Sequence, residues 1–197
     1  MSGAETGYDL ALPGTWWEIP VDDPSATDRA IDRIVGSAVG HRDEDAAARH
    51  ELRTRFRLAA TRARTAGASR LHLCREVVVG VPFPASLTVY RPPIPLAEHG
   101  GRAPLDQLEA VVEAAAEPDD ATLETPAGRV LRRVRVVEAE EGTPEEGLTT
   151  LRVDYWLVPP SRRVLLLSFA CGLPELRDGL VELFDLVVNT VSWSAPA

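Results

Sequence analysis

The sequence predicts an α+β fold, a mostly antiparallel sheet of about six to seven strands with helices packed on its faces. The main observation is the stretch 149–172, in which two strands are joined by a turn at Pro159-Pro160-Ser161. In residues 149–157 apolar and polar side chains alternate, as in a strand with one buried face. Residues 164–169 are almost wholly apolar, which is typical of a strand covered on both faces. This hairpin is the expected centre of the sheet.

The length of the chain favours one domain. Residues 1–12 are expected to be a flexible lead-in, and residues 13–197 a single α+β domain, because 197 residues are an ordinary size for one core. Pro13-Gly14 then turns the chain into a short strand at 15–20. Adjacent Trp16 and Trp17 point to opposite faces of that strand, so one is expected in the core and the other over a surface or under a helix.

Two helices are expected next. Asp22-Asp23-Pro24 is a helix start with proline at the first helical position, and apolar residues at helical spacing continue to near Gly40. The second helix is expected from Asp43 to about Ala66, closed by Gly67, with a narrow apolar stripe along it.

An antiparallel hairpin is expected from strands at 70–79 and 85–90, separated by Gly80 and two prolines. The PxxP pattern from Pro92 to Pro95 favours a structural spacer over a recognition peptide. Pro104 opens a third expected helix, which Pro118 stops.

The C-terminal half continues the sheet. A turn at Pro126-Ala127-Gly128 joins a short strand to a long one, and EEGTPEEG forms a polar tip before the central hairpin. The strands that start near Arg129, Thr149 and Val164 are therefore expected to be consecutive antiparallel neighbours. An amphipathic helix begins at Pro174, and Trp193 is expected to hold the C-terminus against the body.

Composition excludes several classes of function. The net charge of −9 argues against nucleic-acid binding, which needs a basic surface. No apolar run approaches the roughly 20 residues that span a bilayer, so membrane insertion is not expected. The start of the chain has no basic and apolar signal segment, and Cys74 and Cys171 match no metal-binding spacing. A cytoplasmic protein with reduced, buried thiols is expected, over one with a disulfide or a reactive thiol.

No motif in the sequence predicts catalysis, a metal or a cofactor. The four histidines, His41, His50, His72 and His99, are scattered and none forms an HExxH pair. Neither a G-x-S-x-G setting nor a phosphate-binding glycine loop is present, and Ser168 is expected to pack in a strand. We therefore expect a non-enzymatic protein without a cofactor.

An arginine-rich helix is the first candidate surface. Arg49, Arg53 and Arg57 lie on one line at four-residue spacing along the second helix. They form an anion or partner face, or a solvated face whose arginines pair with acids such as Glu51. The second interpretation is favoured.

The second candidate surface is a face of the sheet, which we name the Arg/Trp face. If the strands from Arg129 and Thr149 pair, five residues meet on one side of the sheet: Arg133, Arg135, Arg152, Asp154 and Trp156. Tryptophan and arginine dominate interface hot spots, and a stacked pair adds cation–π attraction. In the alternative interpretation a helix covers Trp156 and the arginines form ordinary cross-strand ion pairs.

Most of the chain also resembles a known group of proteins. The opening LPGTWWEIP, the segment PAGRVLRRVRV and the final hairpin and helix VDYWLVPPSRRVLLLSFACGLPELRDGLVELFDLVVNTVSW are similar to a group of actinobacterial proteins. Their layout is similar to the PsbP-like α/β/α sandwich. The resemblance implies no catalytic residues, and proteins that share the sandwich are mostly similar to binders and assembly factors.

Together these observations predict a cytoplasmic adaptor or chaperone-like accessory factor that docks a protein partner through the Arg/Trp face or the arginine-rich helix. A binder of an anionic or apolar small ligand, held between sheet and helix, is the alternative, and an enzyme of unrecognised type ranks third. Whether an edge strand makes the protein a homodimer stays open.

Overall fold

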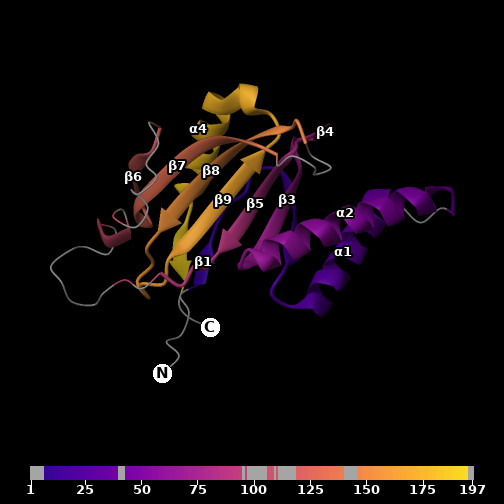
Figure 1. The fold of residues 1–197 in the computed structure, drawn as a ribbon, viewed down its shortest axis with the longest axis horizontal. Helices are drawn as coiled ribbons and strands as arrows, with labels where there is room; N and C mark the ends of the chain where they lie inside the picture. Colours follow the sequence, from indigo (N-terminus) through magenta and orange to yellow (C-terminus); the bar gives the residue numbers. More distant parts are fainter. Residues whose placement is uncertain are drawn as a thin grey trace. The chain divides into compact units, whose positions relative to one another are not determined.

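The computed structural model describes residues 7–39, 43–94, 96, 106–108, 110, 119–139 and 146–194. These residues form two compact units. One runs from Gly14 to Tyr90, and the other joins the chain before residue 14 to the chain from Arg91 onward (Figure 1). Both contain antiparallel strands and helices, so the predicted mostly antiparallel α+β fold is confirmed.

The unit Gly14–Tyr90 places two helices beside a small antiparallel sheet. Its helices are α1 (Pro24–Val39) and α2 (Ala46–Thr65), with a short 3-10 helix at Asp43–Asp45 before α2. Its strands follow the order β2-β3-β5, and a short β4 also pairs with β3. Their bounds are Thr15–Pro20 for β2, Ala68–Val78 for β3, Val81–Pro82 for β4 and Ala85–Tyr90 for β5. The predicted strand, helix pair and hairpin are confirmed.

Local sequence explains where these elements begin. The Asp23 carboxylate accepts a hydrogen bond from the Ser25 amide at 2.8 Å, which satisfies a free amide at the start of α1. Gly14 has a φ of +79°, and a Cβ on it would lie 2.1 Å from the carbonyl oxygen of Glu76. Only glycine therefore fits where β2 approaches β3.

The core of this unit lies between the two helices and the sheet. Trp17 packs edge-on against Phe56 of α2, with ring centroids 6.0 Å apart, while Trp16 is half-buried. Of the two adjacent tryptophans, Trp17 therefore joins the core, as expected of one of them. Buried apolar residues from both helices, from β2 and β3 and from the link after β2 complete it: Ile19, Val21, Ile31, Ile34, Val35, Ala60, Ala63, Ala68 and Leu71.

The second unit is built on a four-stranded antiparallel arrangement in the order β9-β8-β7-β6. Its strands are β6 (Ala121–Thr125), β7 (Gly128–Glu138), β8 (Thr149–Leu157) and β9 (Leu165–Cys171). The three strands predicted to be consecutive antiparallel neighbours are indeed β7, β8 and β9, and the turn after Thr125 joins β6 to β7 as predicted. Every residue of β9 except Ala170 is buried, as its apolar sequence indicates.

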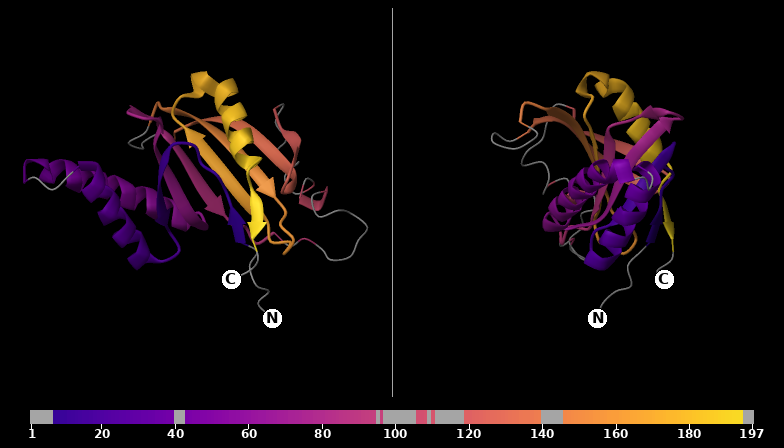
Figure 2. Two further views of the ribbon diagram at one scale, coloured as in Figure 1. Left: turned by 180° about the vertical axis from the view of Figure 1, so that it is seen from behind. Right: turned by 90° about the vertical axis from the view of Figure 1, so that its right-hand side faces the viewer.

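Helix α4 (Arg177–Val188) follows a short 3-10 helix at Pro174–Leu176 and packs against β8 (Figure 2). The ring of Phe184 stacks on Phe169 of β9 with centroids 4.5 Å apart, and Tyr155 of β8 meets Phe169 edge-on at 5.8 Å. All three side chains are buried. One face of the central hairpin is therefore the core of this unit.

The N-terminal lead-in differs from the prediction. Residues Gly7–Asp9 form β1, which pairs antiparallel with β10 (Ser192–Ser194), instead of a wholly loose segment. The expectation that Trp193 anchors the C-terminus is confirmed, because its indole N–H donates to the Ala127 carbonyl at 3.0 Å. These two strands lie at opposite ends of the sequence, so their pairing leaves no local pattern from which it could be predicted.

Some predictions lie wholly or partly outside the described residues. They concern the polar tip after Ala139, Pro95 of the PxxP pattern and most of the third helix, of which Asp106, Gln107, Leu108 and Ala110 are described and helical. The prediction of a single domain stays a prediction.

Candidate partner-binding site

The Arg/Trp face is formed by β7 and β8, as the alternation of their side chains predicts. Leu131, Arg133 and Arg135 lie opposite Trp156, Asp154 and Arg152 in the antiparallel register. On β9, Ser168 lies opposite Asp154. The structure therefore brings all five predicted site residues onto one side of adjacent strands.

A buried carboxylate organises the centre of this face. The side chain of Asp154 is 3% exposed. Its carboxylate forms ion pairs with Arg135 Nη2 at 2.6 Å and with Arg152 Nε at 3.0 Å. The Ser168 hydroxyl donates to the same carboxylate at 2.5 Å. The two arginine side chains are 36% and 40% exposed. Two half-exposed cations thus share one buried anion.

Arg133 is the least accessible arginine of the face. Its side chain is 9% exposed, and its Nε donates to Asp120 at 3.0 Å. A buried guanidinium needs such a partner, because an unpaired charge in the interior is costly. Arg133 therefore joins β7 to the segment before β6 and faces solvent little. The sequence does not predict this pair, because Asp120 lies outside the strands and no local pattern relates it to Arg133.

Trp156 is packed under a helical segment, as in the alternative interpretation, in which a helix covers this side chain and the arginines form cross-strand ion pairs. Its ring joins a small apolar cluster around buried Leu108 and Val164, to which Ile94 and Leu131 also contribute. Leu108 is helical. The described residues place no arginine against the Trp156 ring, so the cation–π contact considered from the sequence is not observed among them.

The opposite end of the Arg/Trp face is open. Val137 is 44% exposed, and Leu148, which precedes β8, is 61% exposed. We call Arg135, Val137, Leu148, Thr150 and Arg152 the open patch. It combines two cations in fixed positions with exposed apolar side chains.

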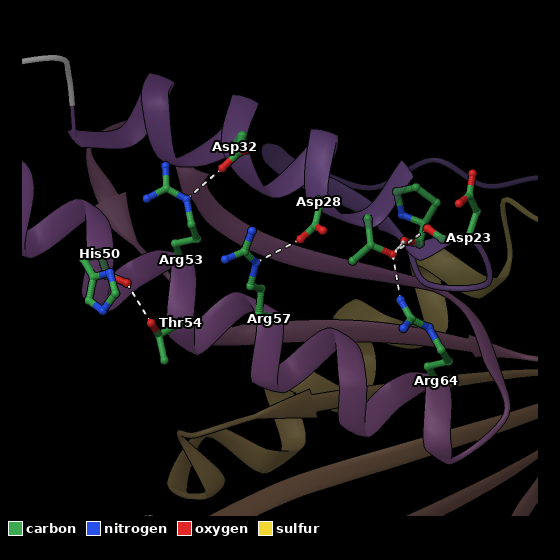
Figure 3. Close-up of polar contacts among 10 residues, drawn as sticks. Asp23, Asp28, Asp32, His50, Arg53, Thr54, Arg57 and Arg64 are labelled. Atoms are coloured by element: carbon green, nitrogen blue, oxygen red, sulfur yellow. Dashed lines mark hydrogen bonds and ion pairs between the residues drawn. The ribbon is translucent and has the colours of Figure 1, made fainter. Parts of the chain in front are cut away.

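The arginine-rich helix has a different arrangement (Figure 3). Arg53 Nε pairs with Asp32 at 2.7 Å and Arg57 Nε pairs with Asp28 at 2.9 Å, both acids lying on α1. Arg49 lies one turn before Arg53 on α2. Arg55 pairs with Glu51 within the helix at 2.5 Å. This pattern favours the interpretation in which the arginines neutralise nearby acids over that of an anion-binding face.

Arg64 closes the same helix pair at its other end (Figure 3). Its Nε donates to the Val21 carbonyl at 2.5 Å and its Nη2 to the Thr27 hydroxyl at 3.0 Å. The Thr27 hydroxyl in turn donates to the Pro20 carbonyl at 2.6 Å. Arg64 therefore holds α2 to the link between β2 and α1, a structural role.

A polar triad beneath α4 was not found from the sequence. The Tyr155 hydroxyl donates to Asp185 Oδ1 at 2.7 Å, and Arg132 pairs with the other oxygen of that carboxylate. Burial, reinforced by the hydrogen bond to Asp185, raises the pKa of the Tyr155 phenol. The period-2 alternation of β7 places Arg132 on the same face as Val130 and Val134, and the packing of α4 shows that Asp185 is its partner.

An open groove lies next to this triad, between α4 and β7. Its volume is about 300 Å³, and two arginines and four acids contribute to its lining, with Val134 and Val181: Arg132, Arg177, Asp119, Asp178, Glu182 and Asp185. Acids outnumber bases there. The groove therefore does not favour an anionic ligand.

Two other groups have shifted pKa values. Burial lowers the pKa of His72, opposed by Glu18 and assisted by Arg70. Burial raises the pKa of the Cys171 thiol, which suits an unreactive core cysteine. Within the described ranges, which exclude His41 and His99, no cluster of three His, Cys, Asp or Glu side chains forms a metal site.

No family model matches the chain, and no curated protein sequence matches it. A solved structure with a similar arrangement is that of LpqN, involved in cell envelope biogenesis of Mycobacterium tuberculosis, at 9% identity and a TM-score of 0.48. The match covers 98% of this chain and 87% of LpqN.

None of the helices in the described part of this chain has the length and apolar character needed to cross a bilayer.

Proposed function

We propose that this protein is a non-enzymatic binding protein, an adaptor or chaperone-like accessory factor, that docks a protein partner on the open patch. The observation that carries the proposal is the pairing of two half-exposed arginines, Arg135 and Arg152, with the one buried carboxylate of Asp154. Exposed Val137 lies on β7, and exposed Leu148 immediately precedes β8.

This arrangement suits recognition of an acidic group. Asp154 neutralises one of the two guanidinium charges that bind it, so the trio carries one positive charge within a chain of net charge −9. The buried carboxylate also fixes both arginines before a partner arrives, which reduces the entropy lost on binding. A partner segment with a carboxylate beside apolar side chains matches the open patch.

The proposal assigns different roles within the predicted Arg/Trp face. Arg135 and Arg152 contact the partner, whereas Arg133 and Trp156 hold the strands and the covering segment in place. The cytoplasm is the proposed location, because both cysteines, Cys74 and Cys171, are free thiols. The sequence also resembles PsbP-like proteins. Proteins with that sandwich mostly look like binders and assembly factors, which favours binding over catalysis.

The test is affinity purification of the tagged protein from its native host, followed by mass spectrometry. We expect a stoichiometric protein partner with the wild type that is lost with Arg135→Glu and with Arg152→Glu, because each change places an acid where the partner's carboxylate binds. Arg33→Glu, at an exposed position of α1, is the matched control and should retain the partner.

Circular dichroism and urea unfolding show whether both glutamate variants keep the wild-type fold. Retention of the partner by folded Arg135→Glu and Arg152→Glu would contradict docking on the open patch. Failure of the wild type to capture any stoichiometric protein would contradict the adaptor function itself.

The groove between α4 and β7 supports a second candidate, a small-ligand binder. In the described part of the chain, Arg132 Nε is buried without a hydrogen-bond partner beside this groove. A neutral molecule with one acceptor and an apolar body suits its lining better than an anion. Such a ligand should stabilise the protein by about 2.7 kcal/mol at a hundredfold excess over its dissociation constant. Val181→Phe, which partly fills the groove, should abolish that shift, and a screen of neutral metabolites and lipids without any shift would remove this candidate.

A further inference from the structure

The outer edge of β7 extends beyond the strand that pairs with it. The pairing of β6 with β7 ends where Ala121 meets Arg132, whereas β7 continues to Glu138 and pairs with β8 along that whole length. In the described part of the chain, Val134–Glu138 therefore have a neighbouring strand on one side only. Figure 1 shows β6 as a short arrow beside the longer β7.

The backbone groups on this edge can be assigned from the ladder. The Ala139 amide donates to the Leu148 carbonyl at 2.9 Å, so the odd-numbered residues of β7 direct their amides and carbonyls to β8. Because these directions alternate along an antiparallel strand, Val134, Val136 and Glu138 direct theirs outward. The edge thus offers a row of donors and acceptors for another strand.

Open space lies along the same edge. A groove of about 450 Å³ is lined by the end of β7 and by two residues outside it: Val134, Arg135, Val136, Val137, Glu138, Asp119 and Arg177. Val136 is 52% and Val137 is 44% exposed, on opposite faces of the strand. The register continues without a bulge to Glu138, opposite Thr149, and no proline occurs in β7. The usual devices that block an exposed edge, proline and a bulge, are therefore missing from this strand.

We propose that the chain forms a two-fold symmetric dimer in which the β7 edges of two copies pair antiparallel, centred on Val136. The inference concerns this edge alone and does not rest on the proposed adaptor function. A second copy is the occupant because the edge is complementary to itself. Hydrogen-bonded pairs must join outward-directed residues, and only registers centred on Arg135, Val136 or Val137 form more than one such pair within Val134–Glu138.

The three registers differ in charge and in extent. Centring on Arg135 places two arginines directly opposite each other, which is destabilising. Centring on Val137 leaves the outward-directed Val134 beyond the partner's Glu138, so fewer pairs form. Centring on Val136 pairs Val136 with its copy, Val134 with the copy's Glu138 and Arg135 with the copy's Val137, with about six backbone hydrogen bonds.

Charge complementarity supports the same register. Val134 and Arg177 line the same groove, and Arg177 is 33% exposed. The copy's Glu138, placed opposite Val134, therefore lies within reach of the Arg177 side chain. Arg177 already pairs with Asp119 at 2.5 Å and with Asp178 at 3.2 Å, so the copy's Glu138 would share this guanidinium with them. Two-fold symmetry repeats the contact, so the dimer gains two such interactions and covers both exposed valines.

The first test is sedimentation of the full chain across the micromolar range. The wild type should be a dimer, and Val136→Pro a monomer, because proline removes an outward amide without removing a hydrogen bond to β8. Val136→Thr, which keeps the amide and the branched side chain, should remain a dimer, as should Arg152→Glu on the open patch. A monomeric wild type, or a folded Val136→Pro that still dimerises, would overturn the proposal.

Cysteine cross-linking tests the register even if the proline variant fails to fold. In a Cys74→Ser background, Val136→Cys should give a disulfide-linked dimer under mild oxidation, because Cα atoms of a hydrogen-bonded pair lie about 5.5 Å apart, within disulfide range. Val137→Cys should not cross-link, since its copy is displaced by two positions along the strand. Equal cross-linking of the two variants, or none with Val136→Cys, would contradict this register.

Discussion

Arg135 and Asp154 are joined across neighbouring strands by a 2.6 Å ion pair in which the carboxylate side chain is 3% exposed and the arginine side chain 36% exposed. Arg152 shares the same carboxylate at 3.0 Å. The buried anion thus depends on cations at the surface, and either arginine alone can still neutralise it. This redundancy has a measurable consequence.

The two arginines should contribute non-additively to stability. Arg135→Ala or Arg152→Ala alone should lower the free energy of unfolding by about 1 kcal/mol or less, because the two arginine side chains are 36% and 40% exposed to solvent and the remaining arginine still pairs with the Asp154 carboxylate. The double variant leaves the Asp154 carboxylate buried without a cation and should cost about 3–5 kcal/mol. Urea unfolding of the four proteins in a double-mutant cycle measures the difference. Single effects that sum to the double effect would show that neither arginine compensates for the loss of the other.

Arg64 should matter more to stability than Arg57, although both are arginines of α2. Arg64→Ala removes hydrogen bonds to the Val21 carbonyl and the Thr27 hydroxyl and should cost about 1–3 kcal/mol. Arg57→Ala breaks an ion pair whose side chains are 51% and 55% exposed, and its cost should stay below about 1 kcal/mol. Thermal unfolding ranks the two variants, and an equal loss would contradict the structural role of Arg64.

His72 should make the protein less stable in mild acid. Burial holds its folded pKa below 6.5, so the unfolded chain binds a proton more readily than the folded protein. The contribution of neutral His72 is therefore fully present above pH 6.5 and decreases as the pH falls below that value. Urea midpoints measured between about pH 7 and 5 should fall less for His72→Gln than for the wild type. His50→Gln, at an exposed position of α2, is the control and should follow the wild type.

Cys171 should be unreactive in the folded protein. Its side chain is buried at the end of β9, and burial raises the pKa of its thiol, so little nucleophilic thiolate is present. In a Cys74→Ser background, a soluble thiol reagent should label the protein only after denaturation. Rapid labelling under native conditions would show that Cys171 is exposed by local opening.

Local sequence patterns were sufficient for most elements. The alternation in Thr149–Leu157 correctly separated the buried face, with Leu151 and Tyr155, from the face that carries Arg152 and Trp156. Proline and glycine marked the start of α1, the end of α2 and the turn between β6 and β7. Periodicity and turn chemistry act over a few residues, so they are visible without a structure.

The accessibility of the candidate site was beyond such patterns. Arg133 and Arg135 occupy equivalent positions in the alternation of β7, yet Arg133 is buried against Asp120 whereas Arg135 remains half-exposed. The cover over Trp156 comes from Leu108, which lies far from it in the sequence. The pairing of β1 with β10 and the bond from Tyr155 to Asp185 are equally remote.

The sequence by itself therefore determined the class of fold, the order of the elements and the face on which each strand residue lies, because these depend on neighbours along the chain. Only the tertiary structure decided which arginines of that face are exposed to solvent, which acids neutralise them and where β7 extends beyond its pairing with β6. Those features depend on packing between segments that are distant in the sequence, where burial and the need to pair each charge select one arrangement.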